Sequence, residues 1–272
     1  MLRPRAVNPG CAISLGLCAC LVLSGCGQQP RAGASPGEKP VEAPARRDIL
    51  VKKLAQKKKL YSQHNEELIT RDFFQDRREG YFLDVGCAWP MKDSNTYFLE
   101  RELGWSGIGV DALPEYAKAW EQERPKSRFF NYLVTDHAGS PEKFFRSELP
   151  GISATAPRKT FSGREVKHTE IRVPTITLTK LLEDNRVGRI DFLSIDIEGA
   201  ELQALAGFDI ERFRPELVCI EWFHVGREKV VAYFAAHGYE RIERYLKYDE
   251  ANDYFTPKAS RDDTGVHATS GM

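Results

Sequence analysis

The chain has 272 residues, of which 42% are hydrophobic and 29% are charged, enough apolar material for one sizeable core. Its 39 basic and 39 acidic residues give a formal net charge of zero, so it lacks the positive field of a general nucleic-acid binder. Beyond the first 26 residues only Cys87 and Cys219 remain, which excludes a disulfide framework and a zinc cluster. We therefore expect one globular domain with appended segments and no nucleic-acid partner.

The N-terminus has the layout of a secretion signal, with two arginines before an uncharged apolar run at 11–23. That run is shorter than the roughly 18 to 20 residues that span a bilayer. The string Leu23-Ser24-Gly25-Cys26 resembles the lipobox of bacterial lipoproteins, which implies cleavage after residues 1–25 and lipid attachment at Cys26. The protein is then expected to be anchored on the extracytoplasmic or periplasmic face of a membrane. A misassigned start site would instead give a cytoplasmic protein.

Four further segments follow the leader. Residues 26–45 are rich in proline and glycine and form a predicted tether. Residues 46–60 place leucines among many lysines and arginines, which predicts a basic helix that docks on the domain or approaches anionic lipid. The predicted domain spans 61–256, and the polar tail at 257–272 is expected to be disordered.

Within the domain, short apolar runs alternate with helical patterns. Taken along the chain, the pattern predicts a strand at 81–85, a helix at 96–103, a strand at 106–111, a helix at 114–124, a strand at 128–134, a loop at 156–172, a helix at 177–184, a strand at 190–196, a helix at 200–206, a strand at 217–221, a helix at 228–237 and final strands within 239–255. This order predicts an α/β fold with a mostly parallel sheet covered by helices on both faces. Ligands of such sheets bind at the carboxyl ends of the strands.

Acidic residues gather at those ends. Any one of them could simply cap a turn or a helix. Together they would repel one another on a single rim unless a ligand offset their charge, so we expect a binding site there. The residues are Asp84, Asp111, Asp136, Asp196, Glu198 and Glu221.

The turn after the first strand indicates the kind of ligand. It contains Gly86 but not the three spaced glycines that hold a dinucleotide pyrophosphate. Asp84 could attract an ammonium group. Asp111 follows Gly86 by 25 residues (111 − 86), close to the roughly 20-residue offset of a ribose-binding acid. A ligand with an amino-acid portion and a ribose, but no phosphate, fits better than a dinucleotide.

Several motifs resemble the FkbM-type S-adenosylmethionine-dependent methyltransferases, which implies a Rossmann-like class I methyltransferase fold. The resemblance covers about 62–239, and its most specific part is the string Asp-Ile-Glu-Gly-Ala-Glu at 196–201. The sequence departs from the family at Trp89-Pro90, where a second glycine is common, and at Thr179, where the family usually has aspartate. The motifs are Ser62-Gln63 with Glu66, residues 82–88, residues 94–96, residues 104–107 and residues 191–201.

The resemblance also implies roles for the acidic rim. An S-adenosylmethionine pocket would be made by Asp84, Gly86, Asn95 and Asp111, with Asp136 near the adenine amine.

Beside the transferring methyl group would lie Asp196, Glu198 and Glu221. A hydroxyl acceptor must lose its proton, and we expect Asp196 or Glu198 to be the base, with His224 as second choice. The three acids could also hold a divalent metal, but a second string of ligand residues is missing, so the sequence does not favour a metal.

Two functions remain open at this point. The first is O-methylation of a hydroxyl on a sugar, glycan or small metabolite. The second is a membrane-tethered, non-catalytic module that binds a ligand or carbohydrate, since an exported domain would lie where S-adenosylmethionine is not normally supplied. The sequence determines neither the acceptor nor the oligomeric state.

Overall fold

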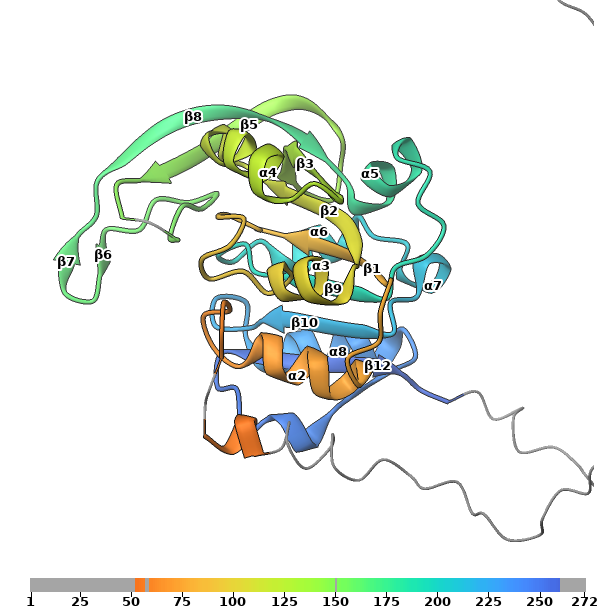
Figure 1. Cartoon of the computed structure of the whole chain (residues 1–272). Helices are drawn as coiled ribbons and strands as arrows, with labels where there is room; N and C mark the ends of the chain where they lie inside the picture. Colours follow the sequence, from red (N-terminus) through yellow and green to blue (C-terminus); the bar gives the residue numbers. More distant parts are fainter. Residues whose placement is uncertain (1–51, 57–58, 150, 260–272) are drawn as a thin grey trace, which may run out of the picture. The chain divides into compact units, whose positions relative to one another are not determined.

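The computed structural model describes residues 52–56, 59–149 and 151–259 (Figure 1). The predicted signal peptide, the lipid site at Cys26, the tether and the tail beyond 259 lie outside these residues. Among the described residues, no helix is both long enough and apolar enough to cross a membrane.

The predicted helix at 46–60 lies partly inside the described residues, where helical backbone covers 52–55 and residues 60–65 form bends. The helix does not reach residue 60, and side chains accept the backbone donors beyond it. The N–H of Tyr61 donates to Glu67 and that of His64 to Glu66.

The main sheet has seven strands, in the order β11-β12-β10-β9-β1-β2-β3. Strand β12 runs antiparallel to β10 and β11, whereas β10, β9, β1, β2 and β3 are parallel neighbours. The expected α/β fold with a mostly parallel sheet is confirmed. The strands are β1 (Tyr81–Val85), β2 (Ser106–Asp111), β3 (Ser127–Asn131), β9 (Phe192–Ile195), β10 (Leu217–Glu221), β11 (Tyr239–Arg241) and β12 (Asn252–Pro257).

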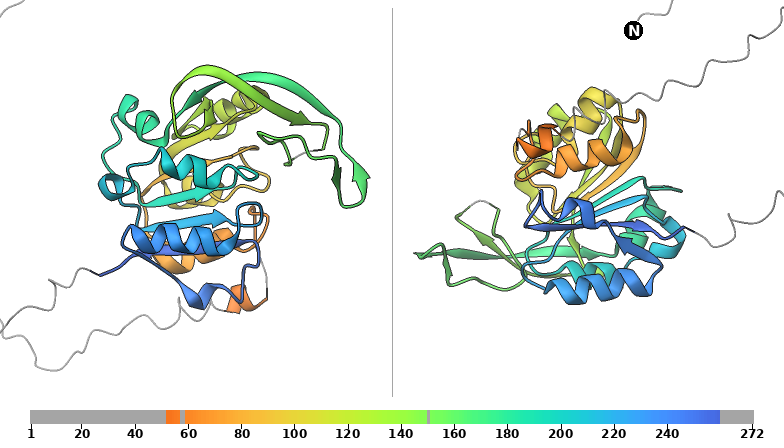
Figure 2. Two further views of the ribbon diagram at one scale, coloured as in Figure 1. Left: turned by 180° about the vertical axis from the view of Figure 1, so that it is seen from behind. Right: turned by 90° about the horizontal axis from the view of Figure 1, so that it is seen from below.

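Helices cover both faces of this sheet, as the alternating pattern predicts (Figures 1 and 2). Buried side chains form a separate apolar cluster on each face: Phe82 of β1 packs on one side, and Leu83 and Val85 pack on the other. Such alternation follows from the two-residue period of a strand. The first face carries α2 (Glu66–Phe74) and α3 (Tyr97–Leu103); the second carries α5 (Leu178–Asp184), α6 (Glu201–Ala206), α7 (Ile210–Phe213) and α8 (Arg227–Ala236); α4 (Ala117–Glu123) follows the short helix η1 (Pro114–Tyr116) and lies beside β3.

A long antiparallel arm, which the sequence did not predict, extends past the carboxyl ends of the parallel strands (Figure 1). The expected strand at 128–134 is divided into two strands, because the chain leaves the main sheet after β3, and Leu133 and Val134 pair with the strand at 168–176 instead. The expected loop at 156–172 is also partly wrong. The arm consists of β4 (Leu133–Val134), β5 (Gly139–Ser147) and β8 (His168–Ile176), with the small hairpin of β6 (Thr160–Phe161) and β7 (Arg164–Glu165) between β5 and β8.

The family departure at Thr179 has a structural explanation. Its hydroxyl donates to the carbonyl of Gly207 at 3.0 Å and accepts from the N–H of Asp209 at 2.8 Å. Thr179 thereby ties the start of α5 to the loop between α6 and α7.

Candidate functional site

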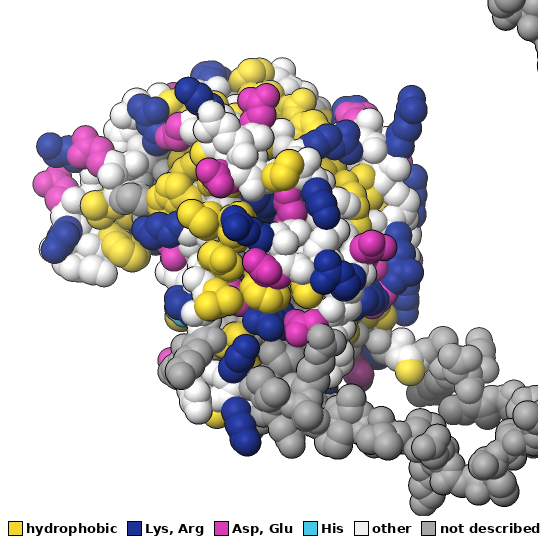
Figure 3. Space-filling model, viewed as in Figure 1, with side chains coloured by type: hydrophobic (Ala, Val, Ile, Leu, Met, Phe, Trp, Pro, Cys, Tyr) yellow, Lys and Arg dark blue, Asp and Glu magenta, His cyan; other side chains and the backbone are white. Residues whose placement is uncertain are grey.

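A cavity of about 600 Å³ opens at the carboxyl ends of β1, β2, β9 and β10, on the side toward which the arm projects. In the space-filling view the arm stands out from the body and carries basic and acidic side chains side by side (Figure 3). Arm residues complete the cavity wall opposite the strand ends. They include Phe144, Ile152, Arg158 and Phe161.

The turn after β1 brings the backbone itself to the cavity. Gly86 has φ +81°, and a Cβ added there would lie 1.8 Å from the carbonyl oxygen of Asp196. Its N–H donates to the carbonyl of Val110 at 2.9 Å. The left-handed conformation favours glycine, and only glycine permits this close approach of two strand ends, because any Cβ would overlap the Asp196 carbonyl.

Asp111, at the end of β2, lines the cavity as predicted. Its two carboxylate oxygens accept the N–H groups of Ala88 at 3.0 Å and Leu113 at 2.8 Å, and burial raises the pKa of Asp111 to about 6. Each oxygen has a second lone pair, so the carboxylate can still accept two ligand hydroxyls. The two backbone bonds hold it in place for that purpose.

Trp89, part of the departure from the family pattern, also lines the cavity and packs edge-on against Tyr116 with ring centroids 5.6 Å apart. The buried Arg124 guanidinium donates to the carbonyl of Pro90 at 2.9 Å and to Glu100 at 2.7 Å. The Trp-Pro pair therefore has a fixed position and supplies an aromatic wall in place of a second glycine. We refer to Gly86, Trp89, Asp111 and Tyr116 as the cofactor half, because it contains Gly86 and Asp111, two of the residues for which the sequence predicts cofactor binding.

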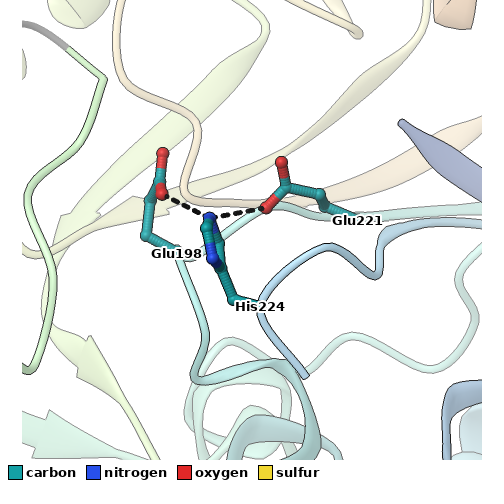
Figure 4. Close-up of side chains that lie close together, drawn as sticks. All are labelled: Glu198, Glu221 and His224. Carbon is teal, nitrogen blue, oxygen red and sulfur yellow. Dashed lines mark ion pairs between the residues drawn. The ribbon is translucent and has the colours of Figure 1, made fainter. Parts of the chain in front are cut away.

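At the ends of β9 and β10 lie Asp196, Glu198, Glu221 and His224, which we refer to as the acidic half. His224 Nε2 lies 3.2 Å from Glu198 Oε2 and 3.9 Å from Glu221 Oε2 (Figure 4). Burial and the neighbouring carboxylates raise the pKa of Glu221 to about 7 and that of Asp196 well above its ordinary value. Three of the predicted acids and the predicted histidine thus meet in one place.

Arg158 reaches the acidic half from the segment between β5 and β6. Its Nη2 donates to Glu198 Oε2 at 2.5 Å and lies 2.7 Å from His224 Nε2. Sequence reasoning missed this residue, because one arginine in a polar segment 40 positions from its partner carries no recognisable pattern.

Three predicted cofactor residues do not line the cavity. Asp84 is buried beneath it, where its carboxylate accepts the hydroxyl of Thr96 at 2.6 Å. The Asn95 amide donates to Ser194 at 3.0 Å. Asp136 is exposed, and hydrogen bonds with His137 and Gln203 lower its pKa.

Strand geometry explains the position of Asp84, and the switch of sheets explains that of Asp136. Asp84 lies two residues after Phe82 and therefore faces α2 and α3. Asp136 follows β4, which pairs with β8 of the arm rather than with the main sheet. The cavity residues after β3 are instead Tyr132, Leu133 and Val134.

The comparisons with known proteins identify the family of the domain. The model of the methyltransferase FkbM domain matches residues 80–254. No curated protein matches the chain.

Among solved structures, the chain is similar to a TehB-like SAM-dependent methyltransferase from Corynebacterium glutamicum, with 14% identity, a TM-score of 0.40, and 79% of this chain and 100% of that chain covered. It is also similar to the 1,6-didemethyltoxoflavin-N1-methyltransferase of Burkholderia thailandensis, with 12% identity, a TM-score of 0.37, and 83% and 95% covered. A third is a SAM-dependent methyltransferase from Geobacter sulfurreducens in complex with S-adenosylhomocysteine, with 9% identity, a TM-score of 0.34, and 74% and 78% covered.

Proposed function

The chain belongs to the FkbM family of S-adenosylmethionine-dependent methyltransferases, and from this premise we propose that it methylates a hydroxyl oxygen on a sugar, glycan or small metabolite. We propose a hydroxyl because of the acidic half. Its carboxylates line the cavity beside the Gly86 turn and could accept the proton of a hydroxyl. Family membership favours this enzyme over the non-catalytic binding module.

The residues of the cofactor half fit S-adenosylmethionine. The glycine turn holds the end of β1 close to Asp196, Asp111 keeps two lone pairs for ribose hydroxyls, and Trp89 with Tyr116 offers an aromatic surface for a base. When bound, S-adenosylmethionine supplies a methyl group on a positively charged sulfur. The cavity volume of about 600 Å³ lies within the range of small-molecule sites.

The chain's own residues have two tasks in this reaction. The first is positioning: the acceptor oxygen must lie in line with the methyl carbon at about 3 Å, and most of the acceleration comes from that placement. The second is removal of the hydroxyl proton, which we assign to Asp196. Burial and nearby carboxylates raise the pKa of Asp196, so its ionised form is a stronger base than an exposed aspartate.

Calorimetry with S-adenosylhomocysteine tests the cofactor half. Asp111→Asn should weaken binding by about 1.5 to 3 kcal/mol, because charged hydrogen bonds to the ribose are lost.

Asp136→Asn is the matched control: the sequence predicts Asp136 in the same pocket, but its side chain is exposed and does not line the cavity. We expect its affinity to equal that of the unmodified protein. The opposite result, with Asp136 sensitive and Asp111 insensitive in folded variants, would move the cofactor site elsewhere.

A further inference from the structure

In and behind the acidic half lie carboxylate oxygens that accept no hydrogen bond from the described residues. Glu221 Oε2, the oxygen that faces His224, has no hydrogen-bond partner among the described residues. Behind it, Glu201 is completely buried and accepts two backbone N–H groups at Oε1, whereas its Oε2 also has no partner in the described part of the chain. The carboxylates of Asp196, Glu201 and Glu221 have oxygens within 4.8 Å of one another.

The histidine and two of the carboxylates point toward the same place. One nitrogen, His224 Nε2, faces both Glu198 and Glu221 (Figure 4), although a ring nitrogen can form only one hydrogen bond along its axis. Two ligands about 2.1 Å from one metal ion are separated by about 3.0 Å at a right angle and about 4.2 Å when opposite. The observed separations of 3.2 Å and 3.9 Å lie between those limits.

A second histidine between two acids shows the contrast. His137 contacts Asp136 through Nδ1 and Glu142 through Nε2, each at 2.8 Å, on the exposed surface. Because the two nitrogens point to different sides of the ring, no single ion could reach all three groups. That cluster is an ordinary ion-pair arrangement, whereas the cluster around His224 is shaped like a coordination site.

We propose that Glu198, Glu221 and His224 bind a divalent transition-metal cation at the floor of the acidic half. Two carboxylates with one imidazole suit Mn²⁺ better than Mg²⁺ or Ca²⁺, which prefer oxygen ligands throughout. The Arg158 guanidinium contacts Glu198 and His224 in this structure, so it offsets part of the same charge and competes with the ion. A cation there would also offset the unpartnered oxygens of Glu221 and Glu201.

The role of the ion rests on the proposed function, but its binding does not. Beside the transferring methyl group, the cation would polarise the acceptor hydroxyl and orient it. Asp196 is outside the proposed ligand set and remains free to take the proton.

Electron paramagnetic resonance of Mn²⁺ titrated into the full chain tests the site, because bound Mn²⁺ loses the signal of the free ion. One Mn²⁺ should bind per chain, and excess Mg²⁺ should not displace it. Glu221→Gln and His224→Gln should each weaken binding at least about 100-fold, whereas His137→Gln, the matched control, should have no effect. Arg158→Ala should tighten binding, because it removes the competing cation.

Three results would overturn the proposal in variants that unfold at the temperature of the unmodified protein. The first is that the unmodified chain does not bind Mn²⁺ at about 1 mM. The second is that both ligand variants bind Mn²⁺ as tightly as the unmodified chain. The third is that Arg158→Ala leaves the affinity for Mn²⁺ unchanged or weakens it. Calorimetry with S-adenosylhomocysteine separates this question from the proposed function. If the chain binds S-adenosylhomocysteine but not Mn²⁺, only the metal-site proposal fails. If it binds Mn²⁺ but not S-adenosylhomocysteine, only the proposed methyl transfer fails.

Discussion

The two halves of the cavity are built by different means. The cofactor half is made largely by backbone: the Gly86 turn approaches Asp196, and backbone N–H groups hold the Asp111 carboxylate. The acidic half is made by charged side chains from separate segments, including Arg158 from the arm. Backbone changes in the first half should therefore act through shape, whereas changes in the second half should act through charge and protonation.

The largest effect is expected from Gly86→Ala. The new Cβ would lie 1.8 Å from a backbone oxygen at φ +81°, so two strand ends would have to move apart. We expect cofactor binding to be lost and the free energy of unfolding to fall by about 4 kcal/mol or more. Urea unfolding and calorimetry with S-adenosylhomocysteine measure both quantities.

Gly188→Ala is the control for that change. A Cβ at Gly188 would have no atom within 4 Å, so its stability and cofactor affinity should match those of the unmodified protein. Equal behaviour of the two alanine variants would show that the cofactor half does not depend on backbone shape.

The next effect concerns proton removal in the acidic half. Asp196→Asn should leave affinity for S-adenosylhomocysteine intact and lower turnover roughly 10²- to 10⁴-fold, because the amide cannot take the proton. Transfer of labelled methyl groups to a panel of sugar hydroxyls provides the rate, with the exposed Asp184→Asn as control. Since the base must be ionised and its pKa is raised, turnover should rise with pH. Unchanged turnover in a folded Asp196→Asn variant would assign the base elsewhere.

The smallest effect concerns stability and pH. Burial and the neighbouring Asp249 carboxylate raise the pKa of Glu66 from 4.5 to about 7. Because the folded state binds the proton more tightly than the unfolded state, this group makes stability fall as pH rises through that window. Between pH 5 and 8 the loss should be on the order of 2 to 3 kcal/mol.

Glu66→Gln tests this account of charge, because the amide does not titrate. Urea unfolding at pH 5 and pH 8 should show a smaller loss of stability in the variant than in the unmodified protein. If the variant and the unmodified protein lose the same stability between pH 5 and pH 8, groups other than Glu66 cause the pH dependence.

The sheet and most of its helices were predictable because their signals are local. Apolar runs ended by Gly86 and Gly104 gave β1 and α3 within a residue of their bounds. Helix α2 was missed although Leu68, Ile69 and Phe74 are among its buried residues. Its other buried residues include Glu66, Glu67 and Asp72, which the sequence alone suggests are exposed. The arm was missed because much of β5 and β8 is exposed, so neither strand alternates clearly.

The sequence by itself determined the family, the parallel sheet and the presence of acids at the strand ends, because motifs and hydrophobic periods are contained in neighbouring residues. Lipid attachment at Cys26 stays a prediction. Only the tertiary structure decided which acids face the cavity, since Asp84 and Asp111 both come from strands but lie in different surroundings. It also decided that Arg158 meets Glu198. No local pattern records that contact, because it depends on how a long arm bends over the sheet.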